Sequence, residues 1–311
     1  MVVGSGRAGL EAALTAGGLG HPVVLVDKDD QLGGLLADQK SIPPEEPPYE
    51  QPEANPVPKL IEEIEASDQI KILKTTNIVK IDGQPGQFKV QLNGSSGLEM
   101  TVGSIVQATG ASPYDASKLD HLGYGASPDV VTSQEFEKML VAGSIACPSD
   151  GRTPERIAYI QCAGSRDENH LKYCSSECCN NTLRQMMEVT KIDSSIQNAV
   201  IYKDMRAPGH MEYFFLSAQK ESAGMMARGD VDKVEANGKL KVHVANSMLG
   251  ENVEIEADLL VLAVGMVPNS ADGELIRELH DSRHQAETSE SSQVRETSTA
   301  RAEELVGHEG T

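Results

Sequence analysis

The sequence of 311 residues contains no tryptophan, four phenylalanines and seven tyrosines. Aromatic side chains are therefore too scarce for a protein whose work is to stack on bases or sugars. Basic residues are also outnumbered, with 27 Lys and Arg against 47 Asp and Glu, and the formal net charge is −20. Since binding to a phosphate backbone requires a basic surface, this composition argues against a nucleic-acid partner.

Long hydrophobic runs are missing as well. No apolar stretch reaches the roughly 18 residues needed to cross a bilayer. Glycines and Arg7 interrupt the apolar N-terminus, so it does not resemble a secretory signal. We therefore expect no membrane span and a cytoplasmic location, either free or attached to the inner face of the membrane through partner subunits. The length allows one large domain or two ordinary ones.

Cysteine is used sparingly but unevenly. Of the five cysteines, Cys147 stands alone and the other four share one short window, at Cys162, Cys174, Cys178 and Cys179. A secreted disulfide framework would spread its cysteines along a short chain. The observed arrangement instead suits a reducing compartment and one local site.

The first part of the chain, residues 1–120, reads as a Rossmann-like α/β domain. A short strand at 1–3 leads through a glycine turn into a helix ending near 17. The strand at 1–3 is so short that we expect residues to be missing upstream of it. A proline-rich loop at 37–58 cannot lie inside a sheet. The remaining predicted elements are a strand at 22–26, a helix at 58–66, strands near 70–80, 87–92 and 98–102, and a strand over 105–110 that ends in glycine.

A second α/β unit follows over residues 150–268 and repeats this order. Both units start as a Rossmann fold, continue into a β meander and end on a hydrophobic strand with a glycine. Its predicted elements are strands at 156–160, 199–202 and 259–264, helices at 178–189 and 211–223, and a meander at 226–257. Residues 270–311 form a polar, helical or flexible tail. The fold class is thus α/β with two dinucleotide-binding domains.

The first glycine turn carries a dinucleotide-binding fingerprint. Gly4, Gly6 and Gly9 lie between a strand and a helix, and Asp27 ends the next strand at about 20 residues' distance. The first glycine permits the tight turn, the second lets the backbone approach a pyrophosphate, and the third packs the helix on the strand. Helix amides would bind the phosphates, and Asp27 would accept hydrogen bonds from the ribose. A purely structural glycine turn is the alternative.

Two further segments favour FAD as the dinucleotide. Gly33 and Gly34 follow Asp27 closely, and Thr109 and Gly110 end the last strand of the first unit. Both segments resemble the parts of two-dinucleotide-binding-domain flavoproteins that line FAD. In such proteins a meander strand also offers backbone contacts to the adenine, and that resemblance places Ile78 there.

The turn of the second unit has cysteines where a nicotinamide-binding domain would have glycines. Residues 161–167 lack the glycine spacing, which disfavours direct use of NAD(P)H. Cys162, Cys174, Cys178 and Cys179 instead place four thiols around one turn and one helix start. Four thiolates suit a [4Fe–4S] cluster, although the spacing is not that of ferredoxins. A redox-active disulfide, a zinc site and unligated structural cysteines are the alternatives.

The cysteine block resembles the A subunits of heterodisulfide reductases. The matching segments are 162–169 and 173–179, and further matches occur at 108–115, 123–125 and 202–206. Within this family the sequence is similar to the B subunits of quinone-interacting membrane-bound oxidoreductases. The resemblance covers about residues 1–275. It implies FAD on the first domain, an iron–sulfur cluster on the four cysteines close to the flavin, and electron transfer between the subunits of a complex.

The resemblance also implies partners. These are other subunits of a heterodisulfide-reductase-like or quinone-interacting complex, with adenylylsulfate reductase among the candidates, in dissimilatory sulfur metabolism. The alternatives are an NAD(P)H-dependent FAD disulfide reductase and a cofactor-free structural subunit. The ferredoxin-type cysteine repeats of longer relatives are missing here, and no segment is expected to return to the first domain after residue 265. We therefore expect a partial chain.

Overall fold

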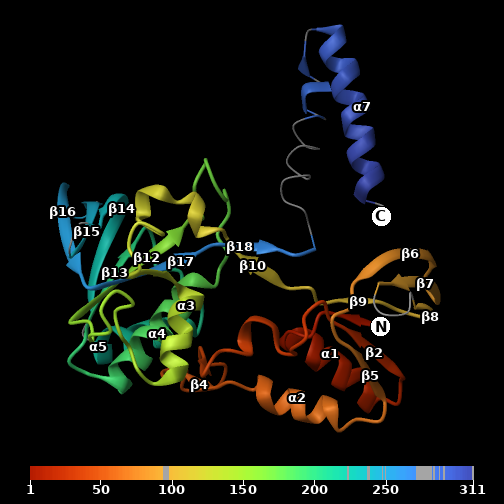
Figure 1. Cartoon of the computed structure of the whole chain (residues 1–311), viewed down its shortest axis with the longest axis horizontal. Coiled ribbons are helices and arrows are strands. Elements are labelled where there is room, and N and C mark those ends of the chain that lie inside the picture. Colours follow the sequence, from red (N-terminus) through yellow and green to blue (C-terminus); the bar gives the residue numbers. More distant parts are fainter. Residues whose placement is uncertain are drawn as a thin grey trace. The chain divides into compact units, whose positions relative to one another are not determined.

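The computed structural model describes residues 1–93, 98–222, 224–236, 239–246, 248, 250–270, 282, 284–286, 288–289 and 291–309. Its contacts divide the chain into two compact units. Unit 1 comprises Met1–Ala37, Pro56–Ser112 and the described residues from Val267 onward, and unit 2 comprises Asp38–Asn55 and Pro113–Met266. Figure 1 labels the elements of both units.

Unit 1 is built on a four-stranded parallel sheet in the order β5-β2-β1-β9. Its strands are β1 (Val2–Val3), β2 (Val23–Val26), β5 (Ile70–Leu73) and β9 (Val106–Gln107). Helix α1 (Arg7–Gly18) connects β1 to β2, and α2 (Val57–Glu65) precedes β5. This strand–helix–strand connection with a parallel sheet is the expected start of a Rossmann fold.

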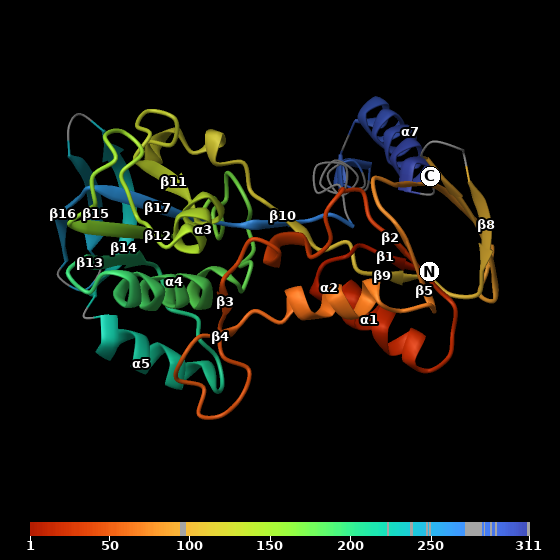
Figure 2. The same cartoon turned by 60° about the horizontal axis from the view of Figure 1, so that its bottom comes forward.

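Each face of the unit 1 sheet is covered by a different layer. Leu10 and Ala13 of α1 pack with Val57 and Ile64 of α2 against buried strand residues on one face, and Figure 2 shows both helices on this side. On the other face, Val26 packs against the antiparallel sheet of β6 (Ile78–Gln84), β7 (Gln87–Leu92) and β8 (Glu99–Val102). The predicted strand near 70–80 is therefore wrong as one element, because it divides into β5 and β6 in two different sheets.

Unit 2 contains a seven-stranded sheet in the order β11-β17-β12-β13-β14-β15-β16. The first five strands are parallel, and β14, β15 and β16 continue as an antiparallel meander. The strands are β11 (Val130–Thr132), β12 (Arg156–Ala163), β13 (Gln197–Tyr202), β14 (Met225–Glu235), β15 (Leu240–Asn246), β16 (Glu251–Ala257) and β17 (Leu259–Val264).

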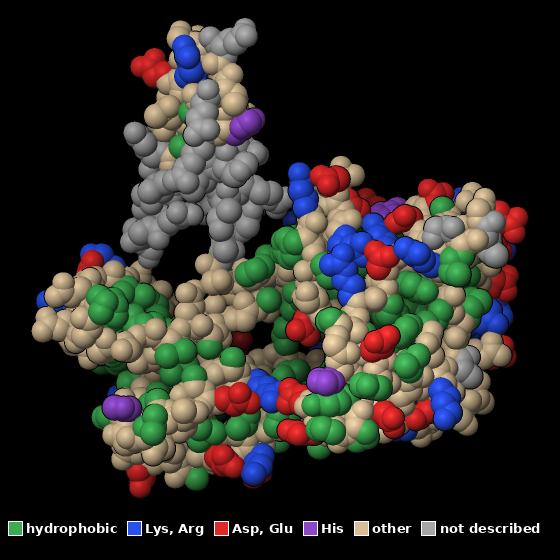
Figure 3. Space-filling view, turned by 180° about the vertical axis from the view of Figure 1, so that it is seen from behind, with side chains coloured by type: hydrophobic (Ala, Val, Ile, Leu, Met, Phe, Trp, Pro, Cys, Tyr) green, Lys and Arg blue, Asp and Glu red, His purple; other side chains and the backbone are tan. Residues whose placement is uncertain are grey.

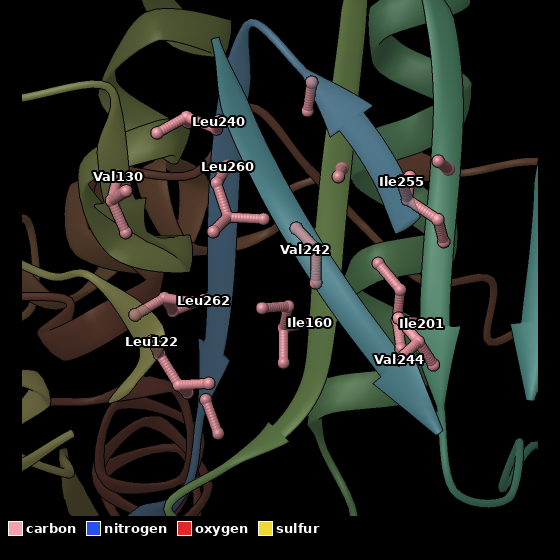
Figure 4. Packing of buried hydrophobic residues seen from close by; sticks show 14 of the residues in the cluster. Leu122, Val130, Ile160, Ile201, Leu240, Val242, Val244, Ile255, Leu260 and Leu262 are labelled. Carbon is pink, nitrogen blue, oxygen red and sulfur yellow. The ribbon is translucent and has the colours of Figure 1, made fainter. Parts of the chain in front are cut away.

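The core of unit 2 lies on both faces of its central strands, since β12 and β17 are buried along nearly their whole length. Helices α3 (Ser133–Ala142) and α4 (Cys178–Ile192) cover one face, and α5 (Met211–Ser222) packs against α4. The other face is covered by the meander and by the 3-10 turns Ala116–Lys118 and Asp120–Leu122. Figure 4 shows Ile160, Val242 and Leu262 packed together there.

The unit boundaries differ from the predicted domains. The predicted first domain ends at residue 120, whereas the contacts place 113–120 in unit 2 together with the loop 38–55. That loop forms a two-stranded ribbon of β3 (Ser41–Ile42) and β4 (Glu53–Ala54). The Ser41 hydroxyl donates a hydrogen bond to Glu188 of α4 at 3.2 Å, so polar contacts fix this excursion on unit 2.

The chain returns to unit 1 after β17, contrary to expectation. The strand β18 (Met266–Pro268) pairs with β10 (Ala111–Pro113), and Asn269 follows it. The Asn269 amide donates to the carbonyl of Gly110 at 3.0 Å, and its side chain donates to that of Thr109 at 2.8 Å. Part of the predicted tail lies outside the described residues, and α7 spans Ser292–Glu309. No helix in the described part of the chain has the length and apolar character to cross a membrane.

Candidate cofactor sites

The three glycines of the first turn have the distinct environments that the fingerprint predicts. Gly4 has a φ of 98°, and a Cβ there would lie 2.2 Å from the carbonyl oxygen of Ala108. A Cβ on Gly9 would lie 1.8 Å from the carbonyl oxygen of Gly4. Around Gly6, by contrast, a Cβ would meet no atom within 4 Å. The turn is therefore packed tightly on its inner side and open at the glycine expected to approach a pyrophosphate.

Helix α1 begins directly after this open position. Gly6 is its N-cap and supplies no side chain to accept from the first amides. The first N–H groups of a helix have no intrahelical acceptor, and the helix dipole places partial positive charge there. The first turn contains no acidic residue that would compete for these donors. Hence the N-terminus of α1 can bind an anion such as a pyrophosphate.

Asp27 lies at the end of β2, beside the glycine turn. Its Oδ2 accepts a hydrogen bond from the amide of Ser5 at 2.5 Å, and its Oδ1 accepts from the amide of Asp29 at 2.9 Å. The carboxylate is thus fixed between the turn and the strand end. An ionised carboxylate has about four acceptor positions, so these two bonds leave capacity for a ribose diol.

Both predicted flavin-lining segments adjoin the glycine turn. Gly33 and Gly34 have positive φ angles of 110° and 56°. The amide of Gly33 donates to the carbonyl of Ser5 at 2.9 Å, and a Cβ on Gly34 would lie 3.1 Å from Cα of Gly6. Thr109 and Gly110 follow β9, next to β1 in the sheet.

Ile78 starts β6, where it pairs with Leu92 in the meander. The preceding turn is tied to the strand end of Asp27, since the amide of Thr76 donates to the Asp27 carbonyl at 2.8 Å. Ile78 therefore lies on a strand that is linked to the same end of β2.

Cys162, the first of the four clustered cysteines, occupies an irregular point in the central strand β12. The register of β12 on β17 shifts between Ile160 and Ala163, and Cys162 between them has a left-handed φ of 58°. Arg166 and Ser176 share this conformation, with φ of 55° and 62°. Such angles cost about 1–3 kcal/mol each for residues other than glycine and cluster at functional sites. The loop from Cys162 to α4 is therefore held in a specific, strained path.

Four thiols gather along this path. Burial raises the pKa of Cys162, Cys178 and Cys179, to about 12 for Cys178. A smaller upward contribution to each pKa comes from the other cysteines, because Cys162 and Cys174 lie near both Cys178 and Cys179. Cys178 is the first residue of α4, and Cys179 accepts a hydrogen bond from the amide of Arg206 at 3.3 Å. The four predicted ligands thus form one group of neighbouring thiols.

Hydrogen bonds attach the cysteine loop to the end of β17. The Ser165 hydroxyl donates to the Tyr173 carbonyl at 2.9 Å, and the amide of Met266 donates to Ser175 Oγ at 2.8 Å. The Tyr173 hydroxyl donates to the Met266 carbonyl at 2.9 Å. These contacts fix residues on both sides of Cys174, so its position relative to Cys178 is set by the backbone.

Charged residues that sequence reasoning did not single out lie beside the thiols. Arg166 donates from Nη2 to Oδ2 of Asp204 at 2.8 Å, and Arg228 donates to Oδ1 of the same carboxylate at 2.8 Å. Arg166 also lowers the pKa of Cys162, although burial raises it by more. Arg166 follows β12 and Asp204 follows β13, at the same end of two neighbouring parallel strands, and this placement was the available signal.

The donor set is compatible with a thiolate-bound cluster. In the described residues, no three His, Cys, Asp or Glu side chains converge on one point as ligands of a single ion. A four-iron cluster binds each thiolate through a different iron, so its ligands need not converge in this way. Next to Cys162, both amide atoms of the buried Gln161 lack a hydrogen-bond partner within the described part of the chain.

Comparisons with known proteins show what this chain is similar to. Residues 1–140 match the family model "Pyridine nucleotide-disulphide oxidoreductase". The A subunit of the H(2)/formate:CoB-CoM heterodisulfide,ferredoxin reductase of Methanococcus maripaludis is 27% identical over 90% of this chain and 55% of its own length. An iron-sulfur A subunit of CoB--CoM heterodisulfide reductase from Methanopyrus kandleri is 36% identical over 55% of this chain and 27% of its own. The chain spans about half the length of the first of these relatives.

Among solved structures, thioredoxin reductase of Lactococcus lactis superposes with a TM-score of 0.57. It is 20% identical, and the match covers 86% of this chain and 78% of that chain. This likeness confirms the predicted fold, in which two Rossmann-like domains follow one another. The family match also supports FAD as the cofactor of an oxidoreductase. By these matches, the chain is similar over most of its length to the A subunits of heterodisulfide reductases and, over residues 1–140, to the pyridine nucleotide-disulphide oxidoreductases.

Proposed function

We propose that this chain is an electron-transfer subunit that holds FAD on unit 1 and a [4Fe–4S] cluster on unit 2. One observation carries the proposal. In a fold with two dinucleotide-binding units, the second unit has a strained loop with four neighbouring thiols where the first has its glycine turn. A bound flavin would exchange one or two electrons, and a thiolate-bound cluster would exchange one.

On unit 1, the chain's own groups would bind and orient the flavin nucleotide. The amides at the start of α1 would bind the pyrophosphate, and Asp27 would accept from the ribose. Gly6 would admit the phosphates because a Cβ there has no neighbour within 4 Å. The segments at Gly33 and Gly110 would complete the cradle, since both adjoin the glycine turn and the end of β1.

On unit 2, Cys162, Cys174, Cys178 and Cys179 would supply the four thiolates. Their burial opposes ionisation of the free thiols, which is why Cys178 has a pKa of about 12. Binding to iron would offset this cost, because a coordinating thiol is deprotonated outright. The amide of Arg206 would then donate to the Cys179 sulfur, as it already does at 3.3 Å.

We propose, further, that the chain works within a complex. The relatives are named as subunits of heterodisulfide reductases, and the sequence resemblance extends to quinone-interacting oxidoreductases. Partner subunits of these kinds, with adenylylsulfate reductase as one candidate in dissimilatory sulfur metabolism, would give and take the electrons. Attachment to the inner face of the membrane would then run through such partners. Native mass spectrometry of the protein purified from its source would identify the subunits.

The deciding experiment is an anaerobic purification followed by absorbance, iron, sulfide and flavin analysis. We expect about four irons and four sulfides per chain, together with flavin. The variant Cys178→Ser should lose the iron–sulfur absorbance and keep the flavin, whereas Cys147→Ser is the matched control outside the loop and should keep both. Flavin without iron in the wild type would favour a disulfide reductase, and the absence of both cofactors would favour a structural role.

A further inference from the structure

Arg166 occupies an unusual position in the cysteine loop. Its backbone has a φ of 55°, and its amide donates to the Tyr173 carbonyl at 3.0 Å. Its side chain is only 21% exposed. A long charged side chain is seldom held in a strained, mostly enclosed position unless its charge has a use there.

The guanidinium is held by an ion pair with Asp204. Oδ2 of Asp204 accepts from Nη2 at 2.8 Å, and Arg228 holds the other oxygen of the same carboxylate at 2.8 Å. Lys203 donates to the Arg166 carbonyl at 3.3 Å and pairs with Asp230 at 3.2 Å. Two guanidinium groups, those of Arg166 and Arg228, therefore share the single carboxylate of Asp204.

The backbone of Asp204 connects this ion pair to the thiols, because its carbonyl oxygen lies 4.0 Å from the sulfur of Cys179. Nη1 of Arg166 is buried and lacks an acceptor of hydrogen-bond geometry within the described residues. The Arg166 backbone lies in the turn that follows Cys162, since the Ser165 amide donates to the Cys162 carbonyl at 3.0 Å. Asp204 thus holds the Arg166 side chain within the loop that carries the thiols.

We propose that Arg166 is a positioning residue for charge, which makes electron uptake at the cysteine site more favourable. This inference rests on the proposed function. Uptake of one electron adds one negative charge to the thiolate-bound group and makes or breaks no bond of the chain. A fixed cation next to that charge stabilises it more in a buried, low-dielectric site than it would in water. Arginine suits this role because it stays protonated at any working pH.

The test compares reduction of the reconstituted protein with reduction of its variants. Arg166→Gln removes the charge, and Arg166→Lys keeps it. Lys172→Gln removes one charge from the same loop at an exposed side chain that pairs with Glu168. Iron and sulfide are assayed first, and dithionite then supplies single electrons in a mediated titration followed by electron paramagnetic resonance.

We expect the ratio of reduced to oxidised centre in Arg166→Gln to fall about tenfold at a fixed potential, which equals about 59 mV for one electron. Arg166→Lys and Lys172→Gln should stay close to the wild type. An unchanged midpoint in Arg166→Gln with full iron would overturn the inference and leave the proposed function standing. A wild type without iron would instead refute the proposed function.

The iron content of the folded variants gives a second readout, which applies if Arg166→Gln does not retain the cluster. If folded Arg166→Gln binds no iron and Arg166→Lys binds it fully, the charge is required at this position and the inference holds. If both variants fold, as judged by circular dichroism, and both lose iron, then the side chain shapes the loop and its charge is not the reason. That outcome would also overturn the inference.

Discussion

At the residue scale, alanine substitutions at two glycines of the same turn should have different effects on stability and on flavin binding. In Gly9→Ala, the new Cβ would lie 1.8 Å from the Gly4 carbonyl oxygen. The turn must shift, and we expect a loss of about 1–3 kcal/mol of stability together with loss of flavin binding. Gly6→Ala introduces a Cβ with no neighbour within 4 Å at an N-cap φ of −64°.

Gly6→Ala should therefore keep its melting temperature and still bind flavin more weakly, because the methyl group occupies the approach to the helix amides. Thermal unfolding of the apoprotein and a fluorescence titration with FAD separate the two effects. Equal flavin affinity of Gly6→Ala and the wild type would show that this turn does not receive the pyrophosphate.

A second residue-scale prediction concerns pH. Asp258 is buried directly before β17. Burial by itself raises the pKa of this carboxyl, but hydrogen bonds from Arg152 and from the amides of Arg156 and Glu155 lower it by more, so the net shift is downward. A carboxyl whose folded pKa is below its unfolded value stabilises the fold above the unfolded pKa. That contribution is lost as the pH falls below 3.8 and through the folded pKa.

We expect Asp258→Asn to cost about 2–4 kcal/mol at pH 7, because Arg152 and two amides lose an anionic acceptor. Urea unfolding from pH 7 down to acid should show the gap between wild type and variant narrowing toward low pH. A gap that stays constant over this range would mean that the charge of Asp258 contributes nothing.

The chemistry of single residues was only partly accessible from the sequence. The glycine fingerprint identified the turn because its spacing is a recurring pattern in which each glycine has a defined backbone role. The contact of Arg166 with Asp204 joins residues 38 positions apart. Its geometry depends on the parallel pairing of β12 with β13, which no local pattern encodes.

At the scale of elements, we expect a substitution on α4 to reduce the stability of the fold strongly. Arg184 is fully buried on it and donates from both Nη1 and Nη2 to the carboxylate of Glu137 on α3. Its Nη1 also reaches Ser41 Oγ at 3.4 Å, so one guanidinium joins α3, α4 and the loop 38–55. Arg184→Met leaves a buried carboxylate without its main partner, and we expect a loss of about 3–5 kcal/mol.

The double variant Arg184→Met with Glu137→Leu should recover most of that loss, because it removes both charges and leaves two apolar side chains. Chemical denaturation of the two single variants and the double variant gives the coupling energy directly. Purely additive losses would contradict a direct ion pair between α3 and α4.

Helix α3 was not predicted from the sequence, although its start carries a recognisable signal. Its start has a capping box, in which Thr132 Oγ1 accepts from the Glu135 amide and the Glu135 side chain accepts from the Thr132 amide. The spacing of a Thr and a Glu three residues later before Phe136 was a readable signal. Helix α4 and strand β12 were predicted at their observed starts, and each continues three residues beyond the predicted end. Both are rich in buried residues, which makes an element visible in the sequence but leaves its end less well defined.

For the whole molecule, the presence of two domains was predictable from the sequence, but the assignment of every segment to its domain was not. Hydrophobic strands ending in glycine mark the repeat of one fold along the chain. The loop 38–55 was expected to stay with the first domain because it lies within it in sequence. It belongs to unit 2 through Ser41 and Gln51, whose side chains bond to Glu188 and Glu221. Such long-range polar contacts depend on the finished fold of both partners.

The net charge of −20 leads to a prediction for the molecule as a whole. Figure 3 shows acidic side chains spread over the visible face, with basic ones among them. Most ion pairs of the described residues are exposed, as in Lys59 with Glu63 and Lys80 with Asp82, and each exposed pair contributes only about 0–1 kcal/mol. Excess negative charge repels itself over longer distances and destabilises the compact state.

Added salt should therefore raise the melting temperature by a few degrees at pH 7. Between about 0.01 and 0.15 M NaCl, the Debye length shortens from about 30 to 8 Å, which screens distant repulsion more than contacts at 3 to 4 Å. Differential scanning calorimetry of the apoprotein in this range measures the effect, and a matched series at pH 5, closer to the sequence pI of 4.8, should show a smaller rise. If salt lowered the melting temperature instead, attractive ion pairs would outweigh repulsion, and the excess of acidic residues would not limit the stability of this fold.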